Sequence, residues 1–99
     1  MNTAEFVDYR SLPPGSHIEV ETRNRQYHIE YLGGDDVRIS GHPEYCPTPV
    51  EGELQGSSDR LGIIEPGLIG TGRHLNFLMS DRRPVTTSKV IKVRVEKPM

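Results

Sequence analysis

Residues 17–32 have the sequence HIEVETRNRQYHIEYL, and this stretch decides the fold. Apolar and polar side chains alternate along both halves of it, which is the period of a β-strand with one buried face. A two-residue turn at Asn24-Arg25 places every inward residue opposite an inward partner, namely Thr22 with Tyr27, Val20 with Ile29 and Ile18 with Tyr31. We predict a hairpin with this register, in which asparagine takes the left-handed conformation that such a turn needs.

Further strands follow the hairpin at short intervals. The turn at residues 33–36 (GGDD) leads into a third strand, and a three-residue loop there would place Ile39 opposite Tyr31. Residues 50–55, 75–79 and 85–95 have the same alternation, and the last of these is long enough to bend near Ser88-Lys89 and pair with a second strand. Short strands separated by glycine and proline turns are typical of a barrel or sandwich. We predict one all-β domain over residues 1–99, a small antiparallel barrel or half-barrel.

The N-terminal segment has a different pattern. Residues 3–10 (TAEFVDYR) predict one or two helical turns capped by Thr3, with Phe6, Val7 and Tyr9 against the body of the domain. The following LPPGS segment ends any helix because proline cannot continue the hydrogen-bond ladder. The short apolar runs at residues 61–64 (LGII) and 68–69 (LI) are expected to be buried.

Composition limits the function classes. The chain has 99 residues, of which 33% are hydrophobic and only 6% aromatic, so we expect part of its buried surface to come from a homo-oligomer. The single Cys46 excludes an internal disulfide framework. The start, MNTAE, lacks the basic and apolar regions of a signal peptide, and no run approaches the ~20 apolar residues of a membrane span. We therefore expect a cytoplasmic protein without a membrane partner.

Charge is unevenly distributed along the sequence. Residues 1–72 hold five Lys/Arg against twelve Asp/Glu, a net charge of −7, whereas residues 73–99 hold seven against two, a net charge of +5. This separation favours head-to-tail association or an anion site on the basic part, unless the fold mixes the two parts and cancels the field. The overall charge of −2 and the absence of tryptophan argue against nucleic acid as a partner.

No motif for catalysis or metal binding is complete. The four histidines are scattered without the spacing of a metal site, and the carboxylates lie on faces predicted to be wet. The glycines of residues 67–72 (GLIGTG) lack the Lys-Ser/Thr ending of a P-loop and the order of a dinucleotide-binding fingerprint. We therefore predict no catalytic residue, no metal, no cofactor and no enzyme activity.

The basic C-terminal part offers the best candidate for a ligand site. Arg82-Arg83 supply two guanidiniums, which bind phosphate through paired hydrogen bonds, and the hydroxyls of Thr86-Thr87 follow one short strand segment later. Arg73-His74 come directly after the glycine-rich segment, whose amides can approach an anion. The predicted ligand-binding residues are Arg73, His74, Arg82, Arg83, Thr86 and Thr87. The alternative is an exposed hairpin tip and an ordinary strand-to-strand turn.

Two fragments, residues 22–29 (TRNRQYHI) and 85–90 (VTTSKV), together resemble a group of short uncharacterised bacterial and phage β proteins. That group includes the Thoeris anti-defence sponges, phage proteins that sequester cyclic-nucleotide immune signals. The resemblance covers about a fifth of the chain. It implies a non-enzymatic binder of an anionic small molecule such as a nucleotide. The binding site would lie either within one subunit or between subunits of an oligomer.

A second function class stays open. An exposed strand edge, or the proline-rich loop around Tyr45, would serve a protein-interaction or structural module without a small-molecule ligand.

Overall fold

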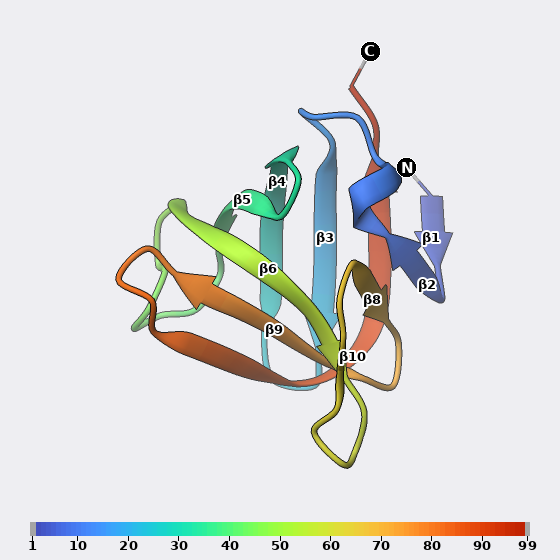
Figure 1. Ribbon diagram of the computed structural model, residues 1–99, viewed down its shortest axis with the longest axis vertical. Helices are drawn as coiled ribbons and strands as arrows, with labels where there is room; N and C mark the ends of the chain where they lie inside the picture. The colour runs from blue at the N-terminus through green and yellow to red at the C-terminus, as the bar shows by residue number, and fades with distance from the viewer. Residues whose placement is uncertain (1, 99) are drawn as a thin grey trace.

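The computed structural model describes residues 2–98, which form short strands and one 3-10 turn (Figure 1). The elements are β1 (Asn2–Ala4), β2 (Phe6–Asp8), η1 (Tyr9–Ser11), β3 (His17–Thr22), β4 (Gln26–Gly33), β5 (Asp36–Ser40), β6 (Val50–Ser58), β7 (Ile64–Glu65), β8 (Leu68–Gly70), β9 (His74–Met79) and β10 (Pro84–Glu96). Within the described residues, no helix has the length and apolar character needed to cross a bilayer.

The main sheet closes into a ring. Strand β10 pairs with β3, and the pairing continues through β4, β5, β6 and β9 back to β10, every pair being antiparallel. In Figure 1, β6 and β9 cross in front of β3 and β4. Strands β1 and β7 extend the sheet beyond the ring, and β2 pairs with β8 in a small second sheet. The predicted all-β barrel is confirmed.

Strand β10 turns the corner of the barrel. Its first part pairs with β9 and its second part with β3, and the register shifts twice, between Thr86 and Lys89 and again between Val90 and Lys92. Each shift adds one residue to β10, and such bulges bend a strand and increase its twist. The alternation therefore breaks: Val90 is buried and Ile91 is 51% exposed. The predicted bend near Ser88-Lys89 is confirmed.

The barrel interior is filled by the apolar face of the strands. Ile18, Val20 and Ile29 are fully buried, and Tyr27 and Tyr31 lie inward as their sequence positions predict. The ring of Tyr27 meets that of Phe77 edge-on with 5.9 Å between ring centres, and Tyr31 meets Tyr9 in the same way at 6.2 Å. Such pairs stabilise a core beyond the area that they bury.

The hairpin register differs from the predicted one by two residues. Val20 lies opposite Tyr27 and Ile18 opposite Ile29, so the turn tip is Arg23-Asn24. The Thr22 hydroxyl accepts the Arg25 N–H at 3.0 Å and donates to the Arg25 carbonyl at 2.9 Å, which closes the turn with a side chain. The predicted left-handed Asn24 is also wrong, because Arg82 (φ 70°) is the one described non-glycine residue with a positive φ.

The third strand is shifted in the same way, with Ile39 opposite Ile29 rather than Tyr31. A slip of two residues keeps every side chain on its own face of the sheet. Hydrophobic alternation is therefore satisfied equally by both registers, and only the turn chemistry distinguishes them.

The N-terminal prediction is mostly wrong. Residues 6–8 form strand β2, with Val7 opposite Ile69 of β8, and Thr3 lies in β1 rather than capping a helix. The helical part is the single 3-10 turn η1. Val7 and Tyr9 are buried as predicted, but Phe6 is 55% exposed because neighbouring residues of a strand face opposite sides.

The two apolar runs behave differently. Ile69 is buried as expected, whereas Leu61 and Ile63 are 75% and 63% exposed. They lie in the loop of residues 59–63, which connects β6 to β7 and extends from the lower end of the barrel in Figure 1. Asp59 orders this loop, because its carboxylate accepts the N–H groups of Leu61 and Ile63 at 2.9 and 3.1 Å. The expected burial of residues 61–64 is wrong for the single chain.

Candidate binding cleft

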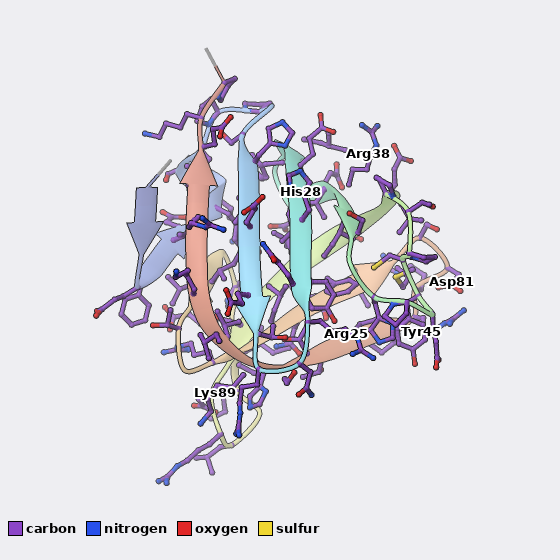
Figure 2. The ribbon with its side chains drawn as sticks, turned by 180° about the vertical axis from the view of Figure 1, so that it is seen from behind. Arg25, His28, Arg38, Tyr45, Asp81 and Lys89 are labelled. Atoms are coloured by element: carbon purple, nitrogen blue, oxygen red, sulfur yellow. The ribbon has the colours of Figure 1, made fainter. Side chains whose placement is uncertain are left out.

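A cleft of about 360 Å³ opens where three distant segments meet. The turn between β3 and β4, the loop between β5 and β6, and the first part of β10 form its sides. Figure 2 shows Arg25 and Tyr45, from the first two of these segments, at the same end of the molecule. The lining residues are Asn24, Arg25, Tyr27, His42, Tyr45, Pro84, Val85, Thr86 and Ser88.

Tyr27 reaches the cleft from the barrel core. Burial raises the pKa of its phenol, the nearby Cys46 thiol raises it further, and Arg25 acts in the opposite direction. The Tyr27 hydroxyl makes no hydrogen bond with any described residue. Among these residues, every fully enclosed side-chain polar atom has a hydrogen-bond partner, so the hydroxyl is not fully enclosed. The hydroxyl therefore has no internal partner, although only 2% of Tyr27 is exposed.

The loop between β5 and β6 forms a pre-ordered wall. Nδ1 of His42 accepts the N–H groups of Glu44 and Tyr45 at 3.1 and 3.2 Å, and its ring stacks on that of Tyr45 at 4.4 Å. Gly41 begins the loop with φ 129°, and a side chain there would overlap the Gln26 carbonyl oxygen. Only glycine lets the loop approach β4 this closely.

The loop also buries the single cysteine. Cys46 lies inside this wall, and burial raises the pKa of its thiol. A buried thiol with a raised pKa is a poor nucleophile.

Tyr45 of the same loop is half-buried and packs against the core. The Arg83 guanidinium lies over its ring, 5.4 Å from the ring centre. Tyr45 therefore contributes to the packing of this loop against the barrel.

The cleft is basic and rich in hydroxyl groups. No Asp or Glu lines it. Arg25 is half-buried and forms no ion pair with any described residue, unlike Arg10, Arg38, Arg73, Arg82, Arg83 and Arg94. The Ser88 hydroxyl lies at the edge of hydrogen-bond distance, 3.4 Å from that of Thr22. A cation with hydroxyl and amide donors around it can bind an anion.

Of the predicted ligand residues, Thr86 lines the cleft and Arg83 borders it through Tyr45. The Thr86 hydroxyl donates to the Asn76 side-chain oxygen at 2.8 Å. Arg82 and Arg83 do not form a joint grip, because Arg82 pairs with Glu53 at 2.9 Å and Arg83 with Asp81 at 2.8 Å. The pKa of the Asp81 carboxyl is below its usual value, mainly because the backbone N–H of Arg83 donates a hydrogen bond to it. The Arg83 guanidinium lowers this pKa further.

The other three predicted residues lie elsewhere. Arg73 pairs with Glu65 at 3.4 Å, and His74 Nδ1 lies 2.9 Å from the Thr87 carbonyl oxygen. Thr87 faces the interior, where its hydroxyl accepts the Leu75 N–H at 3.1 Å. Thr87 is buried and does not line the cleft, so Thr86 and Thr87 do not contribute to one site.

Ion pairs also join the acidic and basic parts of the sequence. Arg94 binds Glu19 at 3.1 Å, while Arg73 and Arg82 bind Glu65 and Glu53. The charge separation along the chain is therefore not a separation in space.

Sequence reasoning missed most of the cleft, including Arg25 and Tyr27, because no local pattern links its three segments. Six of the nine lining residues nevertheless fall in the two fragments 22–29 and 85–90, namely Asn24, Arg25, Tyr27, Val85, Thr86 and Ser88. The chain matches no known family model, curated protein or solved structure at a significant level.

Proposed function

We propose that this protein is a non-enzymatic module that binds a small anionic molecule, such as a nucleotide, in the cleft. The observation that carries the proposal is Arg25, a half-buried cation without a carboxylate partner among the described residues, in a cleft without Asp or Glu. A volume of about 360 Å³ is within the range of small-molecule sites, at its smaller end.

The chemistry of the lining fits a phosphate group. The Arg25 guanidinium would bind two phosphate oxygens side by side, as guanidinium–phosphate pairs commonly do. The Tyr27 and Ser88 hydroxyls and the Asn24 amide supply neutral donors from both sides of the cleft. The sugar or base would lie toward the His42–Tyr45 wall, whose pre-ordering lowers the entropic cost of binding.

The resemblance of residues 22–29 and 85–90 to cyclic-nucleotide sponges supports the same class of ligand. Both fragments contribute directly to the cleft. We therefore favour a nucleotide-derived signal over an inorganic ion as the ligand. The protein would sequester this signal, and its biological role would be phage anti-defence.

The test is thermal unfolding with a panel of linear and cyclic nucleotides and inorganic phosphate, each near 1 mM. A ligand at ~100 times its dissociation constant adds about 2.7 kcal/mol to the free energy of unfolding. Arg25→Gln should abolish the shift, whereas Arg23→Gln, in the same turn but outside the cleft lining, should keep it. No shift across the panel, or equal shifts in both variants, would count against the proposal.

One observation favours the alternative of a self-associating interaction module. Leu61 and Ile63 are exposed on an ordered loop, and β7 beside them is an edge strand of the sheet. Exposed apolar groups and free strand edges are common association sites. Sedimentation velocity of the double variant Leu61→Asn/Ile63→Asn should show loss of an oligomer that Ile91→Asn, a change at another exposed apolar residue, retains. A monomeric wild-type chain would dispose of this alternative.

A further inference from the structure

Two histidines meet on the outer face of the β3–β4 hairpin. His17 lies opposite Glu30 and His28 opposite Glu19, so the two rings are diagonal neighbours. Nδ1 of His17 is 3.1 Å from Nε2 of His28. Both side chains are exposed, and Figure 2 shows His28 away from Arg25 and Tyr45 of the cleft. Nothing proposed for the cleft uses this pair.

The spacing of the two nitrogens suits a shared metal ion. Imidazole nitrogens lie about 2.0–2.1 Å from Zn²⁺, so two of them at a tetrahedral angle are roughly 3.3 Å apart. The observed 3.1 Å is close to that value. An ion could therefore replace the shared proton with small rotations of two exposed rings.

A carboxylate lies behind one ring. Oε1 of Glu19 is 3.7 Å from Nδ1 of His28, the nitrogen that does not face His17, so the two groups are close but not hydrogen-bonded. Arg94 of β10 holds Glu19 in place at 3.1 Å. Metal-binding histidines usually donate their second N–H to such a group, which fixes the tautomer that leaves the other nitrogen free.

The surroundings favour a cation. Glu96 of β10 lies opposite His17 on the other side, and Glu30 of β4 lies opposite it in the hairpin. Arg38 engages Glu30 at 3.0 Å, so Glu30 remains an outer neighbour. Among the described residues, no group of three or more His, Cys, Asp or Glu is arranged to hold a metal. The pair therefore supplies two ligands, and water would complete the coordination.

We propose that His17 Nδ1 and His28 Nε2 form a surface site for a divalent metal that prefers imidazole, represented by Zn²⁺. The eleven-residue separation of the two histidines matches no sequence motif, and the hairpin alone brings them together. The ion would connect β3 to β4 in the folded chain and so stabilise it.

Calorimetric titration of the tag-free protein with ZnCl₂ at pH 7.5 tests the site, with MgCl₂ as the control ion. Zn²⁺ binding and a rise in melting temperature are expected, without an effect of Mg²⁺. His17→Gln and His28→Gln should each reduce Zn²⁺ affinity at least tenfold, whereas His74→Gln on β9 should not. Absence of Zn²⁺ binding, or equal binding in all three variants, would overturn the proposal.

Two further readouts separate coordination from general effects on folding. Glu19→Gln should weaken Zn²⁺ binding by roughly 10-fold or more, as loss of such a partner typically does. Zn²⁺ affinity should also fall when the pH is lowered from 7.5 to 5.5, because protons compete with the metal for imidazole nitrogens. An affinity that is the same at both pH values would contradict coordination by the two rings.

Discussion

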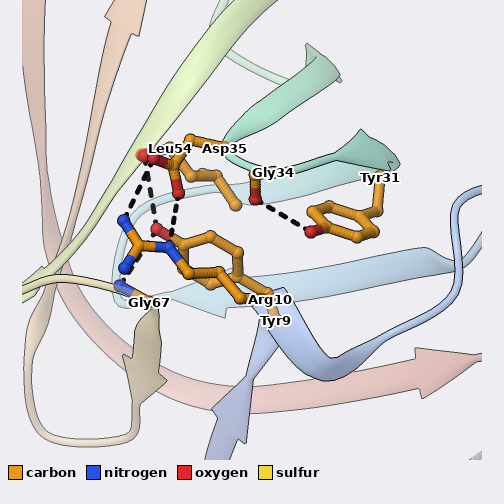
Figure 3. Close-up of polar contacts among 7 residues, drawn as sticks. All are labelled: Tyr9, Arg10, Tyr31, Gly34, Asp35, Leu54 and Gly67. Carbon is orange, nitrogen blue, oxygen red and sulfur yellow. Dashed lines mark hydrogen bonds and ion pairs between the residues drawn. The ribbon is translucent and has the colours of Figure 1, made fainter.

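Two buried tyrosines, each beside an arginine, have opposite surroundings. In the Tyr9 corner, formed by Tyr9, Arg10 and Asp35 (Figure 3), the Tyr9 hydroxyl donates to the Leu54 carbonyl and accepts the Gly67 N–H, both at 3.2 Å. Arg10 binds both carboxylate oxygens of Asp35, at 2.8 and 3.0 Å. In the cleft, the Tyr27 hydroxyl and the Arg25 guanidinium have no such partners among the described residues.

The difference distinguishes a structural contact from the proposed binding cleft. The Tyr9 corner ties η1 to the β4–β5 turn, to β6 and to the start of β8, so its polar groups are used within the chain. The cleft holds the same two residue types at a surface where their capacity for hydrogen bonds is unused. We infer that the first pair contributes to stability and the second to ligand binding.

The largest expected effect is the loss of the Tyr9 hydroxyl. Tyr9→Phe leaves the Leu54 carbonyl and the Gly67 N–H without their partner inside the fold, which should lower the free energy of unfolding by about 3 kcal/mol. Tyr27→Phe should change it by less than about 0.5 kcal/mol, because no internal hydrogen bond is lost. Urea denaturation measures both, and equal losses in the two variants would erase the contrast.

Alkaline pH should give the next largest effect. Burial raises the pKa of Tyr9 from 10.0 to about 12, so the folded state resists ionisation more strongly than the unfolded state. This stability is fully present below pH 10 and is lost as pH rises toward 12, by about 2 kcal/mol in total. Absorbance of tyrosinate followed alongside circular dichroism should show the buried tyrosines, Tyr9, Tyr27 and Tyr31, ionising together with unfolding, because burial raises the pKa of each. The Tyr9→Phe variant should lose less stability between pH 10 and 12, because it has no phenol at this position to ionise.

The smallest expected effect concerns the two arginines. Arg10→Gln removes a two-point contact with Asp35 at a largely exposed site, so it should cause only a small loss of stability, and a smaller one at high salt. Arg25→Gln should leave stability within about 0.5 kcal/mol while removing anion binding. Melting curves at low and high salt measure the first change. A stability loss for Arg25→Gln as large as that for Arg10→Gln would show that Arg25 is structural.

The strands of the barrel were predictable because a buried face imposes alternation. The pattern around residues 17–32 identified the hairpin and placed Tyr27 and Tyr31 in the core. It did not identify the register, since a slip of two residues preserves every face and the Thr22 hydroxyl decides the turn. In β10, alternation also failed where bulges moved Val90 inward and Ile91 outward.

The candidate site was less predictable than the fold. Proximity in sequence grouped Arg82 with Arg83 and Thr86 with Thr87. The strand periodicity sends the two threonines to opposite faces, and nearby carboxylates engage the two arginines. A site formed by residues 24–27, 42–45 and 84–88 has no local signature, because its members become neighbours only when the ring of strands closes.

The alternation in the sequence is enough to predict an all-β protein with a bent last strand. Those properties depend on local periodicity and residue type. Only the folded chain brings Arg25 and Thr86 to one cleft and His17 beside His28. It also leaves Leu61 and Ile63, in the loop of residues 59–63, exposed. These contacts depend on strand register, which the turn chemistry sets and which can slip by whole residues. They also depend on barrel closure, which brings distant segments together.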